Sequence, residues 1–242
     1  MRPLRRIIGW LVTLAVMSFA GLAVFALSRG RPQDLPWAPL DLSQPAGLFT
    51  GRKIAALGDD IAACGAQLNR AGVRHTVLPA VRDGQCGYAN AVRLSPGGAR
   101  QVALAPTAVG LSCPVAAGLS LWEWDVVQPA ARRYFGQRVA SLDHYGSYSC
   151  RRIYGRNTGD LSEHASANAL DVAGFRLEDG TRITVLGDWK DTGDKGKFLR
   201  AVRTGACNVF ATVLSPDYNA AHRDHLHLDQ ADRGTAGWRA CR

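Results

Sequence analysis

The chain has 242 residues, of which 47% are hydrophobic and 20% are charged. This composition shows no sign of disorder and fits one domain, or one domain with an appended subdomain. There are 29 basic and 20 acidic residues, but five arginines and no acids lie in residues 1–32, so the remainder carries a net charge of only +4. So small a charge suits an anionic polymer such as cell wall and argues against nucleic-acid binding.

Residues 1–30 predict a transmembrane anchor. Three arginines precede an uncharged apolar run of 21 residues at positions 7–27, and about 20 such residues suffice to cross a bilayer as a helix. The preceding positive charge favours a cytoplasmic N-terminus and an exported remainder. A cleaved secretory signal ending near Ala26 is the alternative, although a signal has only roughly 7–15 apolar residues. We expect a single pass of the inner membrane through residues 7–27, with the domain in the periplasm.

The next two stretches predict a linker and the start of the domain. Residues 31–50 contain four prolines and little periodicity, which predicts a tether. Residues 51–110 form the N-terminal part of the domain. An apolar stripe over Ile54–Leu68 predicts a helix with Cys64 on its buried face. Short strands punctuated by glycine and proline are expected at 73–78, 91–94 and 101–105.

The remaining stretch, 111–242, starts with a long helix over Pro114–Phe135 that Pro129 is expected to kink. Trp122 lies on the apolar stripe of this helix, which favours core packing over a sugar-stacking platform. Further strands are expected at 139–143, 148–153, 168–175, 182–186 and 224–229, with a hairpin turn at 178–180 and a helix over 194–204. Helices come early and strands interleave without a βαβ rhythm, so the predicted class is α+β.

The six cysteines are predicted to form disulfides. None belongs to a C-x-x-C pair, which argues against a thiolate zinc site or a thioredoxin-type motif. An even number of scattered cysteines in an exported chain is typical of disulfides. The sequence does not choose among the connectivities, and our expectation is pairing between neighbours: Cys64 with Cys86, Cys113 with Cys150, and Cys207 with Cys241.

The segment from Ser162 to Asp171 is the first of two clusters that indicate a metal. Six residues separate His164 from Asp171, and three alanines among them allow a tight loop that leads into a strand. Asp171 begins an apolar stretch, so its carboxylate is expected on a buried strand, where it needs a partner. A metal is one such partner. An arginine, with His164 in an exposed loop, is the alternative.

The segment from His222 to Asp229 is the second cluster. His225 and His227 alternate with leucines, so on a strand both imidazoles point to one face, with Asp229 behind them. The alternative is a solvated polar strand edge. A catalytic zinc takes three imidazole or carboxylate ligands and leaves one position open for water. The first cluster and one of the later histidines supply such a set.

Together the two clusters give the pattern S-x-H-x6-D followed by H-x-H. This pattern resembles the LAS metallopeptidases, which comprise D-Ala-D-Ala carboxypeptidases and dipeptidases, murein endopeptidases and the hedgehog signalling domain. The chain more closely resembles the bacterial extensin-like C-terminal family, over roughly 54–241. The residues that carry this resemblance are Tyr148–Arg151, Ser162–Ala165, Asn168–Asp171 and the stretch from Ser215 to Asp229. It implies a disulfide-bonded core at 111–242 with an antiparallel sheet and flanking helices.

The resemblance implies a role for each site residue. One zinc ion would be held by His164, Asp171 and His227. His225 would stand beside the metal as a catalytic residue, and Arg151, rather than Arg152, would contact a substrate carbonyl or carboxylate. Asp229, or a backbone carbonyl, is expected to hold the second ring nitrogen of a ligating histidine.

The general base is the open question of the pattern. Asp224 lies three residues before His227, where the carboxypeptidase branch has a glutamate base. Aspartate is shorter, and on a strand its side chain would face away from His225. His222 and His225 are therefore favoured for proton transfer, with Asp224 as second choice. Ala167 also stands where the family usually has glycine.

The predicted function is a membrane-tethered, zinc-dependent peptidase, of carboxypeptidase or endopeptidase type, that acts on peptidoglycan peptides. Zinc lowers the pKa of its bound water towards ~7 and polarises the scissile carbonyl. The alternative is a LAS-fold protein that binds cell wall or envelope with little or no turnover, which the missing glutamate favours. A disulfide-bonded structural domain without metal is a third hypothesis, and the co-facing histidines argue against it.

Overall fold

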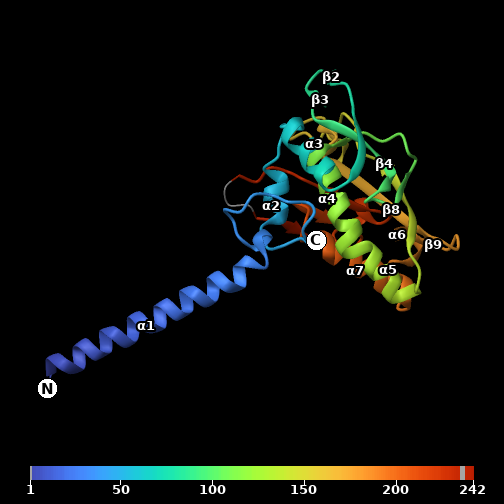
Figure 1. Ribbon diagram of the computed structural model, residues 1–242. Helices are drawn as coiled ribbons and strands as arrows, with labels where there is room; N and C mark the ends of the chain where they lie inside the picture. Colours follow the sequence, from blue (N-terminus) through green and yellow to red (C-terminus); the bar gives the residue numbers. More distant parts are fainter. Residues whose placement is uncertain (1, 235–237) are drawn as a thin grey trace.

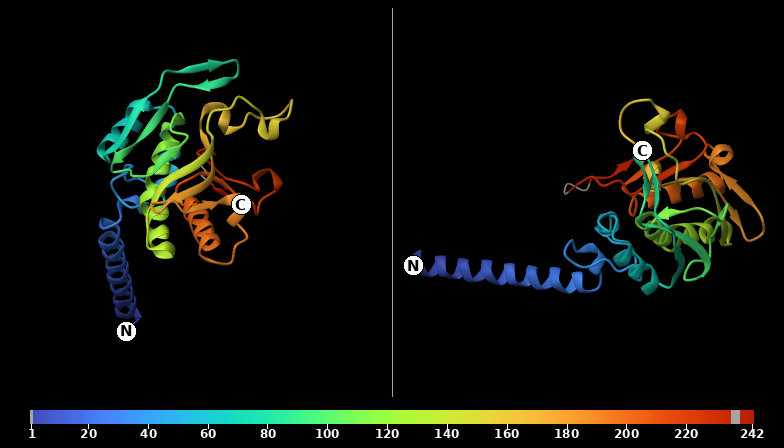
Figure 2. Two further views of the ribbon diagram at one scale, coloured as in Figure 1. Left: turned by 90° about the vertical axis from the view of Figure 1, so that its right-hand side faces the viewer. Right: turned by 90° about the horizontal axis from the view of Figure 1, so that it is seen from above.

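The structure is a computed structural model that describes residues 2–234 and 238–242. Helix α1 (Arg2–Arg29) projects from the domain that the rest of the chain builds (Figure 1, Figure 2). Its segment Pro3–Ala26 is long and apolar enough to cross a membrane, and it is not buried against the domain. A membrane anchor and a signal sequence both fit such a helix.

The proline-rich segment 31–50 lies against the domain. It opens with the 3-10 turn η1 (Pro32–Asp34), where the backbone carbonyl of Gln33 accepts a hydrogen bond from Phe49 N at 3.2 Å. Leu40 and Leu42 are buried in the core. The prolines of the segment predict a free tether, but most of it packs on the domain, because its leucines supply apolar surface that the domain buries.

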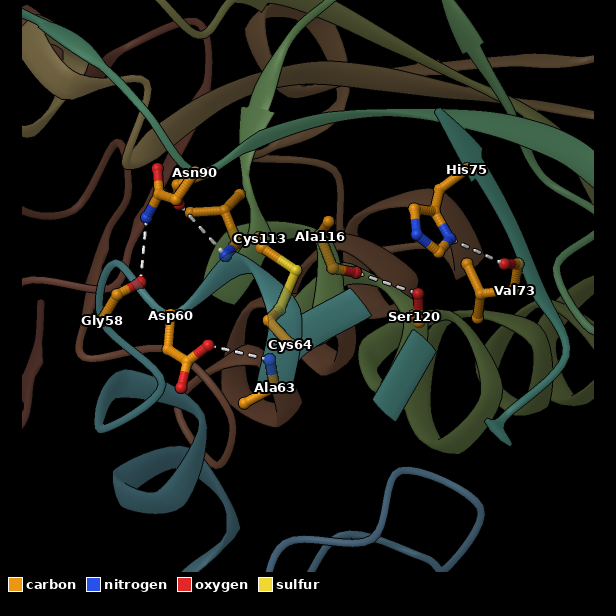
Figure 3. Close-up of a disulfide and its surroundings, with 12 residues drawn as sticks. Gly58, Asp60, Ala63, Cys64, Val73, His75, Asn90, Cys113, Ala116 and Ser120 are labelled. Carbon is orange, nitrogen blue, oxygen red and sulfur yellow. Dashed lines mark hydrogen bonds between the residues drawn. A yellow bond between two sulfur atoms is a disulfide. The ribbon is translucent and has the colours of Figure 1, made fainter. Parts of the chain in front are cut away.

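The apolar stripe at 54–68 forms two helices where one is expected. Helix α2 (Thr50–Ala55) ends before Gly58, whose φ of 47° is left-handed, and α3 (Ile61–Arg70) begins after it. Asp60 caps α3 by accepting a hydrogen bond from Ala63 N at 2.9 Å (Figure 3). A left-handed glycine followed by a capping aspartate ends one helix and starts the next.

The long helix expected over Pro114–Phe135 is present. Its parts are α4 (Cys113–Trp122), the π-helical segment η2 (Glu123–Val127) and α5 (Gln128–Phe135). Trp122 is 1% exposed, and its indole N–H donates to the carbonyl of Val202 at 2.8 Å, so it packs in the core as predicted. Every residue of α4 is buried, which makes this helix the central support of the domain.

The largest sheet carries the two histidine clusters. Its order is β12-β10-β11-β8-β7-β5, with β9 paired to β8, and only β5–β7 and β10–β12 are parallel pairs among the described strands. The strands are β5 (Ala103–Ala105), β7 (Val139–Gly146), β8 (Ala169–Leu177), β9 (Arg182–Thr184), β10 (Thr212–Leu214), β11 (Leu226–Asp229) and β12 (Ala240–Cys241). The mixed α+β class with antiparallel sheets is confirmed.

Smaller elements complete the domain. A second sheet has the order β1-β4-β6, and a separate hairpin, β2–β3, protrudes from the domain (Figure 1). Their bounds are β1 (Val73–Val77), β2 (Val81–Asp83), β3 (Cys86–Tyr88), β4 (Ala91–Gly98) and β6 (Leu111–Ser112). Helices α6 (Val185–Asp188) and α7 (Asp194–Ala206) follow β9. The strand expected at 148–153 is wrong: Gly146, with a φ of 125°, ends β7, and a loop leads to the turn η3 (Ile153–Gly155).

Alternation along β8 and β11 separates the core from the clusters. Leu170 and Val172 on β8, and Leu226 and Leu228 on β11, are fully buried members of the core. Side chains on a strand alternate between its two faces, so the residues between these leucines and valine point to the opposite face of the sheet. The opposite face is where the candidate ligands gather.

The cysteines form three disulfides, but two of the three expected pairs are wrong. The bonds are Cys64–Cys113, Cys86–Cys150 and Cys207–Cys241. The first crosses from α3 to α4, which pack side by side (Figure 3). The second fastens the β2–β3 hairpin to the loop after β7. Pairing by nearness in sequence fails there because helix packing and the protruding hairpin set which cysteines meet.

Candidate metal centre

Three side chains from separate elements converge on the large sheet. His164 lies in the 3-10 turn η4 (Glu163–Ser166), while Asp171 on β8 and His227 on β11 are cross-strand partners. Asp171 Oδ1 is 3.2 Å from His164 Nε2 and 2.9 Å from His227 Nδ1, and the two nitrogens are 3.2 Å apart. All three residues are buried, and within the described part of the chain they are the one group that could hold a metal ion.

Each of the two imidazoles is oriented by an acceptor on its far side. His164 Nδ1 donates to the backbone carbonyl of Ser147 at 2.6 Å, which leaves Nε2 to face the centre. His227 Nε2 donates to Asp229 Oδ2 at 3.0 Å, which leaves Nδ1 to face the centre. Carbonyl and carboxylate partners of this kind fix the tautomer and ring orientation of metal-binding histidines. They are the two kinds of partner expected from the sequence.

The electrostatics of the centre couple its carboxylate to its imidazoles. Burial alone would raise the pKa of the Asp171 carboxyl, but hydrogen bonds and positive charge from His164 and His227 outweigh it and hold that pKa well below its ordinary value. Burial alone would lower the pKa of His227, but hydrogen bonds to Asp171 and Asp229 raise it to about 9. The carboxylate thus stays ionised and holds a proton on His227. A metal ion that replaces this proton meets the same negative charge.

The spacing of the three donor atoms can be compared with that of zinc ligands. Zinc binds imidazole nitrogen and carboxylate oxygen at about 2.0–2.2 Å in tetrahedral geometry, so its ligand atoms lie roughly 3.3–3.5 Å apart. The three separations here, 2.9–3.2 Å, are close to that spacing. The shortest of them, 2.9 Å, is a hydrogen bond in which His227 Nδ1 donates to Asp171 Oδ1.

His225 stands beside the three ligand candidates. Its Nε2 is 3.5 Å from Asp171 Oδ1, and its Nδ1 is 2.9 Å from Asp224 Oδ1. Strand β11 begins only at Leu226, so Asp224 lies in the preceding turn and faces His225, whereas a strand over 224–229 would have turned it away. Through this contact the Asp224 carboxylate fixes the orientation of the His225 ring.

His222 lies next to His225 in the 3-10 turn η5 (Ala220–His222) and is 8% exposed. Its ring centroid is 5.2 Å from that of His225, and its Nδ1 is 2.8 Å from Asn219 Oδ1. Burial and the neighbouring imidazoles lower the pKa of His222 to about 4. This ring is therefore neutral at pH 7.

The cluster lies in an open cleft of about 820 Å³. Arg151 lines this cleft with 47% of its side chain exposed, and its Nη2 is 3.8 Å from Asp171 Oδ2. Arg152 instead reaches Gln85 Oε1 in the β2–β3 turn at 3.2 Å. The structure thus places Arg151, and not Arg152, beside the candidate ligands.

The turn that presents His164 depends on Ala167. Ser162 starts the turn by accepting from His164 N at 3.4 Å, and Ala167 ends it with a φ of 56°. The carbonyl of Ala167 then accepts a hydrogen bond from Ser112 N at 2.8 Å. A left-handed φ favours glycine, so the alanine at this position is strained.

Every site residue expected from the sequence lies in or directly behind the cleft, but three partners were missed. Ser147 contacts His164 through its backbone carbonyl, for which the sequence carries no side-chain signal, and its hydroxyl donates to the carbonyl of Ala167 at 3.1 Å. Asn219 precedes His222 by three residues, a capping spacing that could have identified it. Glu163 lines the cleft, accepts from Asn168 Nδ2 at 2.6 Å, and has a pKa that burial raises.

The fold and site define a disulfide-bonded α+β domain, behind an apolar N-terminal helix, that gathers a buried His–Asp–His set in an open cleft. The family model described as extensin-like protein C-terminus matches residues 62–242. The chain belongs to this family. No curated protein and no solved structure matches the chain.

Proposed function

We propose that this protein is a zinc-dependent peptidase, held at the periplasmic side of the inner membrane, that acts on peptidoglycan peptides. The observation that carries the proposal is the convergence of His164 Nε2, Asp171 Oδ1 and His227 Nδ1 within 2.9–3.2 Å, beside a histidine that is not part of the set. The motif resemblance to LAS metallopeptidases supports the same reaction type. The apolar helix and the three disulfides support export.

His164, Asp171 and His227 would hold the metal. A zinc ion bound there would activate water and polarise the scissile carbonyl. The outer contacts to Ser147 and Asp229 keep the ligand atoms aimed at one point, so little reorganisation is needed on binding.

His225 is the proposed proton carrier. Its Nδ1 donates to Asp224, which leaves Nε2 facing Asp171 at 3.5 Å and free to accept a proton from water at the centre. The same nitrogen can then donate to the leaving amine. The Asp224–His225 pair therefore supplies the function that the missing glutamate left open. His222, neutral and packed against His225, is placed to hydrogen-bond the reacting groups.

Arg151 is the proposed anchor for the substrate. Its guanidinium is half exposed, lines the cleft, and is only loosely paired with Asp171. A free guanidinium binds a carboxylate through two parallel hydrogen bonds, which fixes the orientation of a peptide end. A peptide carboxylate, or the carbonyl next to the scissile bond, fits this position.

The decisive experiment is metal analysis of the purified full-length protein followed by chromatography of muropeptides from sacculi treated with it. We expect one zinc per chain and altered muropeptides, and neither with His227→Ala. Wild-type protein without stoichiometric zinc would overturn the proposal. Zinc without any altered muropeptide would replace it with the alternative, a cell-wall binding protein.

A pair of variants separates ligand from proton carrier. His164→Ala should abolish both zinc binding and activity, whereas His225→Ala should keep zinc and lower turnover by roughly 10²–10⁴-fold. Equal loss of zinc in both variants would show that the third ligand is assigned wrongly.

A further inference from the structure

A second arginine, Arg233, lines the cleft and forms no salt bridge with the acidic side chains that the structure describes. It follows β11, and its Nη2 donates to the hydroxyl of Thr212 on β10. Its guanidinium carbon lies 4.2 Å from the ring centroid of Trp238, a stacked geometry, and both residues line the cleft. A stacked guanidinium is held in one plane before any ligand arrives, which lowers the entropic cost of binding an anion.

Among the described residues, 2–234 and 238–242, burial raises the pKa of the Glu163 carboxyl, and the nearby charge of Arg233 partly opposes that shift. The Nε of Arg233 is buried without a hydrogen-bond partner, and Arg233 forms no ion pair with any of these residues. The nearby carboxylates have other partners: Asp229 holds His227 and Ala231 N, Glu163 holds Asn168, and Asp232 holds Gly234 N. A partly buried cation with an unused donor is favourably completed by a carboxylate.

Arg151 and Arg233 contact the two strands that lie on either side of β11, the strand that carries His227. Arg151 is next to Asp171 on β8, Arg233 is anchored on Thr212 of β10, and His227 lies on β11 between those two strands. Neighbouring strands are about 4.8 Å apart, so the two anchoring strands are roughly 10 Å apart. An extended peptide covers this span with about three residues, since each adds roughly 3.3–3.6 Å.

We infer that the cleft selects peptides with two carboxylates about three residues apart, one bound by Arg151 and the second by Arg233 stacked on Trp238. A peptide bond that lies between the two carboxylates would then cross the candidate metal centre. This inference rests on the proposed function for cleavage of that bond, but the recognition of the second carboxylate does not depend on turnover. It makes Arg233 a specificity-determining residue and anionic peptides the substrate class.

The test compares two probes that differ in one charge. N-acetyl-Glu-Ala-Ala and N-acetyl-Gln-Ala-Ala, each with a free terminus and with either L- or D-alanines, are titrated calorimetrically into zinc-loaded full-length protein in detergent. We expect the wild type to bind the Glu probe of one stereochemical series about tenfold more tightly than its Gln counterpart, as one charge-assisted pair provides. Arg233→Gln should reduce this ratio to about one, and Trp238→Ala should lower it partway.

Two further variants give the comparison its controls. Arg223→Gln removes the same charge from an exposed arginine outside the cleft lining and should keep the ratio. Arg151→Gln should weaken both probes equally, because they share the terminal carboxylate. An equal fall of the ratio in Arg223→Gln, or no preference in the wild type, would overturn the inference. Arg233→Lys, which keeps the charge, should retain part of the ratio, and an unchanged melting temperature in Arg233→Gln excludes misfolding as the cause.

The same probes separate this inference from the proposed function. Binding that depends on Arg233, together with unaltered muropeptides from treated sacculi, would leave the second carboxylate site standing and refute the peptidase. If the probes are cleaved, and the preference for Glu over Gln is the same in Arg233→Gln and in wild type, the peptidase would stand and the second carboxylate site would be refuted.

Discussion

Two buried groups of charged side chains in this domain have opposite designs. Arg100 and Glu123 are 2% and 3% exposed, and Arg100 Nε lies 2.8 Å from Glu123 Oε2. The other carboxylate oxygen of Glu123 accepts from the backbone nitrogens of residues 101 and 102 at 2.7 and 3.1 Å. Burial lowers the pKa of Arg100 and the charge of Glu123 opposes that shift. The two charges thus face each other as a buried ion pair, and neither residue lines the cleft that holds the metal candidates.

The His164–Asp171–His227 group is nearly as buried, at 2%, 8% and 9% exposed, but it is open at its centre. Its outer nitrogens are tied to Ser147 and Asp229, while its inner atoms share one point at the floor of a cleft. Burial and charge alone therefore do not distinguish a site from a structural pair. What distinguishes a candidate site is that its ligand atoms converge on one point that solvent can reach.

The largest effect on stability is expected from breaking the ion pair between Arg100 and Glu123. Glu123→Gln leaves Arg100 charged and unpaired in the core, which should lower the free energy of unfolding by about 3–5 kcal/mol. Urea unfolding measures the change. Replacing both residues with leucine removes both charges but leaves the backbone N–H groups of residues 101 and 102 without their acceptor, so it should recover only part of the loss. A Glu123→Gln variant as stable as wild type would show that the pair is not a structural support.

The group of His164, Asp171 and His227 should make the stability of the zinc-free protein depend on pH. The pKa of His227 is raised from 6.5 to about 9, so its stabilisation is complete below pH 6.5 and is lost as the pH rises through 9. The loss amounts to about 3 kcal/mol. The depressed pKa of Asp171 acts oppositely and costs stability only in acid. Denaturation of chelator-treated protein between pH 6 and 10 tests this, and His227→Gln should flatten the profile.

The outer contacts should tune metal affinity with little effect on folding. Asp229→Asn weakens the acceptor that orients His227, which should reduce zinc affinity roughly 10–100-fold, or about 1.4–2.7 kcal/mol. Competition with a chromophoric chelator measures it. The matched control is Asp143→Asn, which removes a carboxylate paired with Arg182 at 3.0 Å on the same sheet. Equal losses in both variants would mean that the effect is a general one of charge.

The smallest effect is expected at the turn that presents His164. Ala167→Gly relieves the left-handed strain but frees the unfolded chain and removes a buried methyl, so stability should stay within about 1 kcal/mol of wild type. Ala167→Val, branched and fully buried in the same conformation, should cost about 2 kcal/mol or more. Thermal unfolding of the two variants checks this, and equal stability would contradict the role assigned to the positive φ.

Local pattern was enough for several features of the fold and the site. The alternation of His225 and His227 with leucines placed Leu226 and Leu228 in the core, and the apolar stripe placed Trp122 there. The helix at Asp194–Ala206 and the hairpin of β8 and β9 follow from their periodicity and turn residues in the same way. These features depend on residues a few positions apart, whose contacts are fixed by helical or extended geometry.

Other features were decided by segments that are distant in sequence. Cys64 pairs with Cys113 because α3 packs on α4, and Asp224 faces His225 because β11 starts two residues later than the pattern suggested. Arg233 enters the cleft only because β10 and β11 are neighbours. The sequence by itself determined which side chains could bind a metal and on which face they lie. The tertiary structure decided their partners and roles, because those depend on long-range packing that no local period encodes.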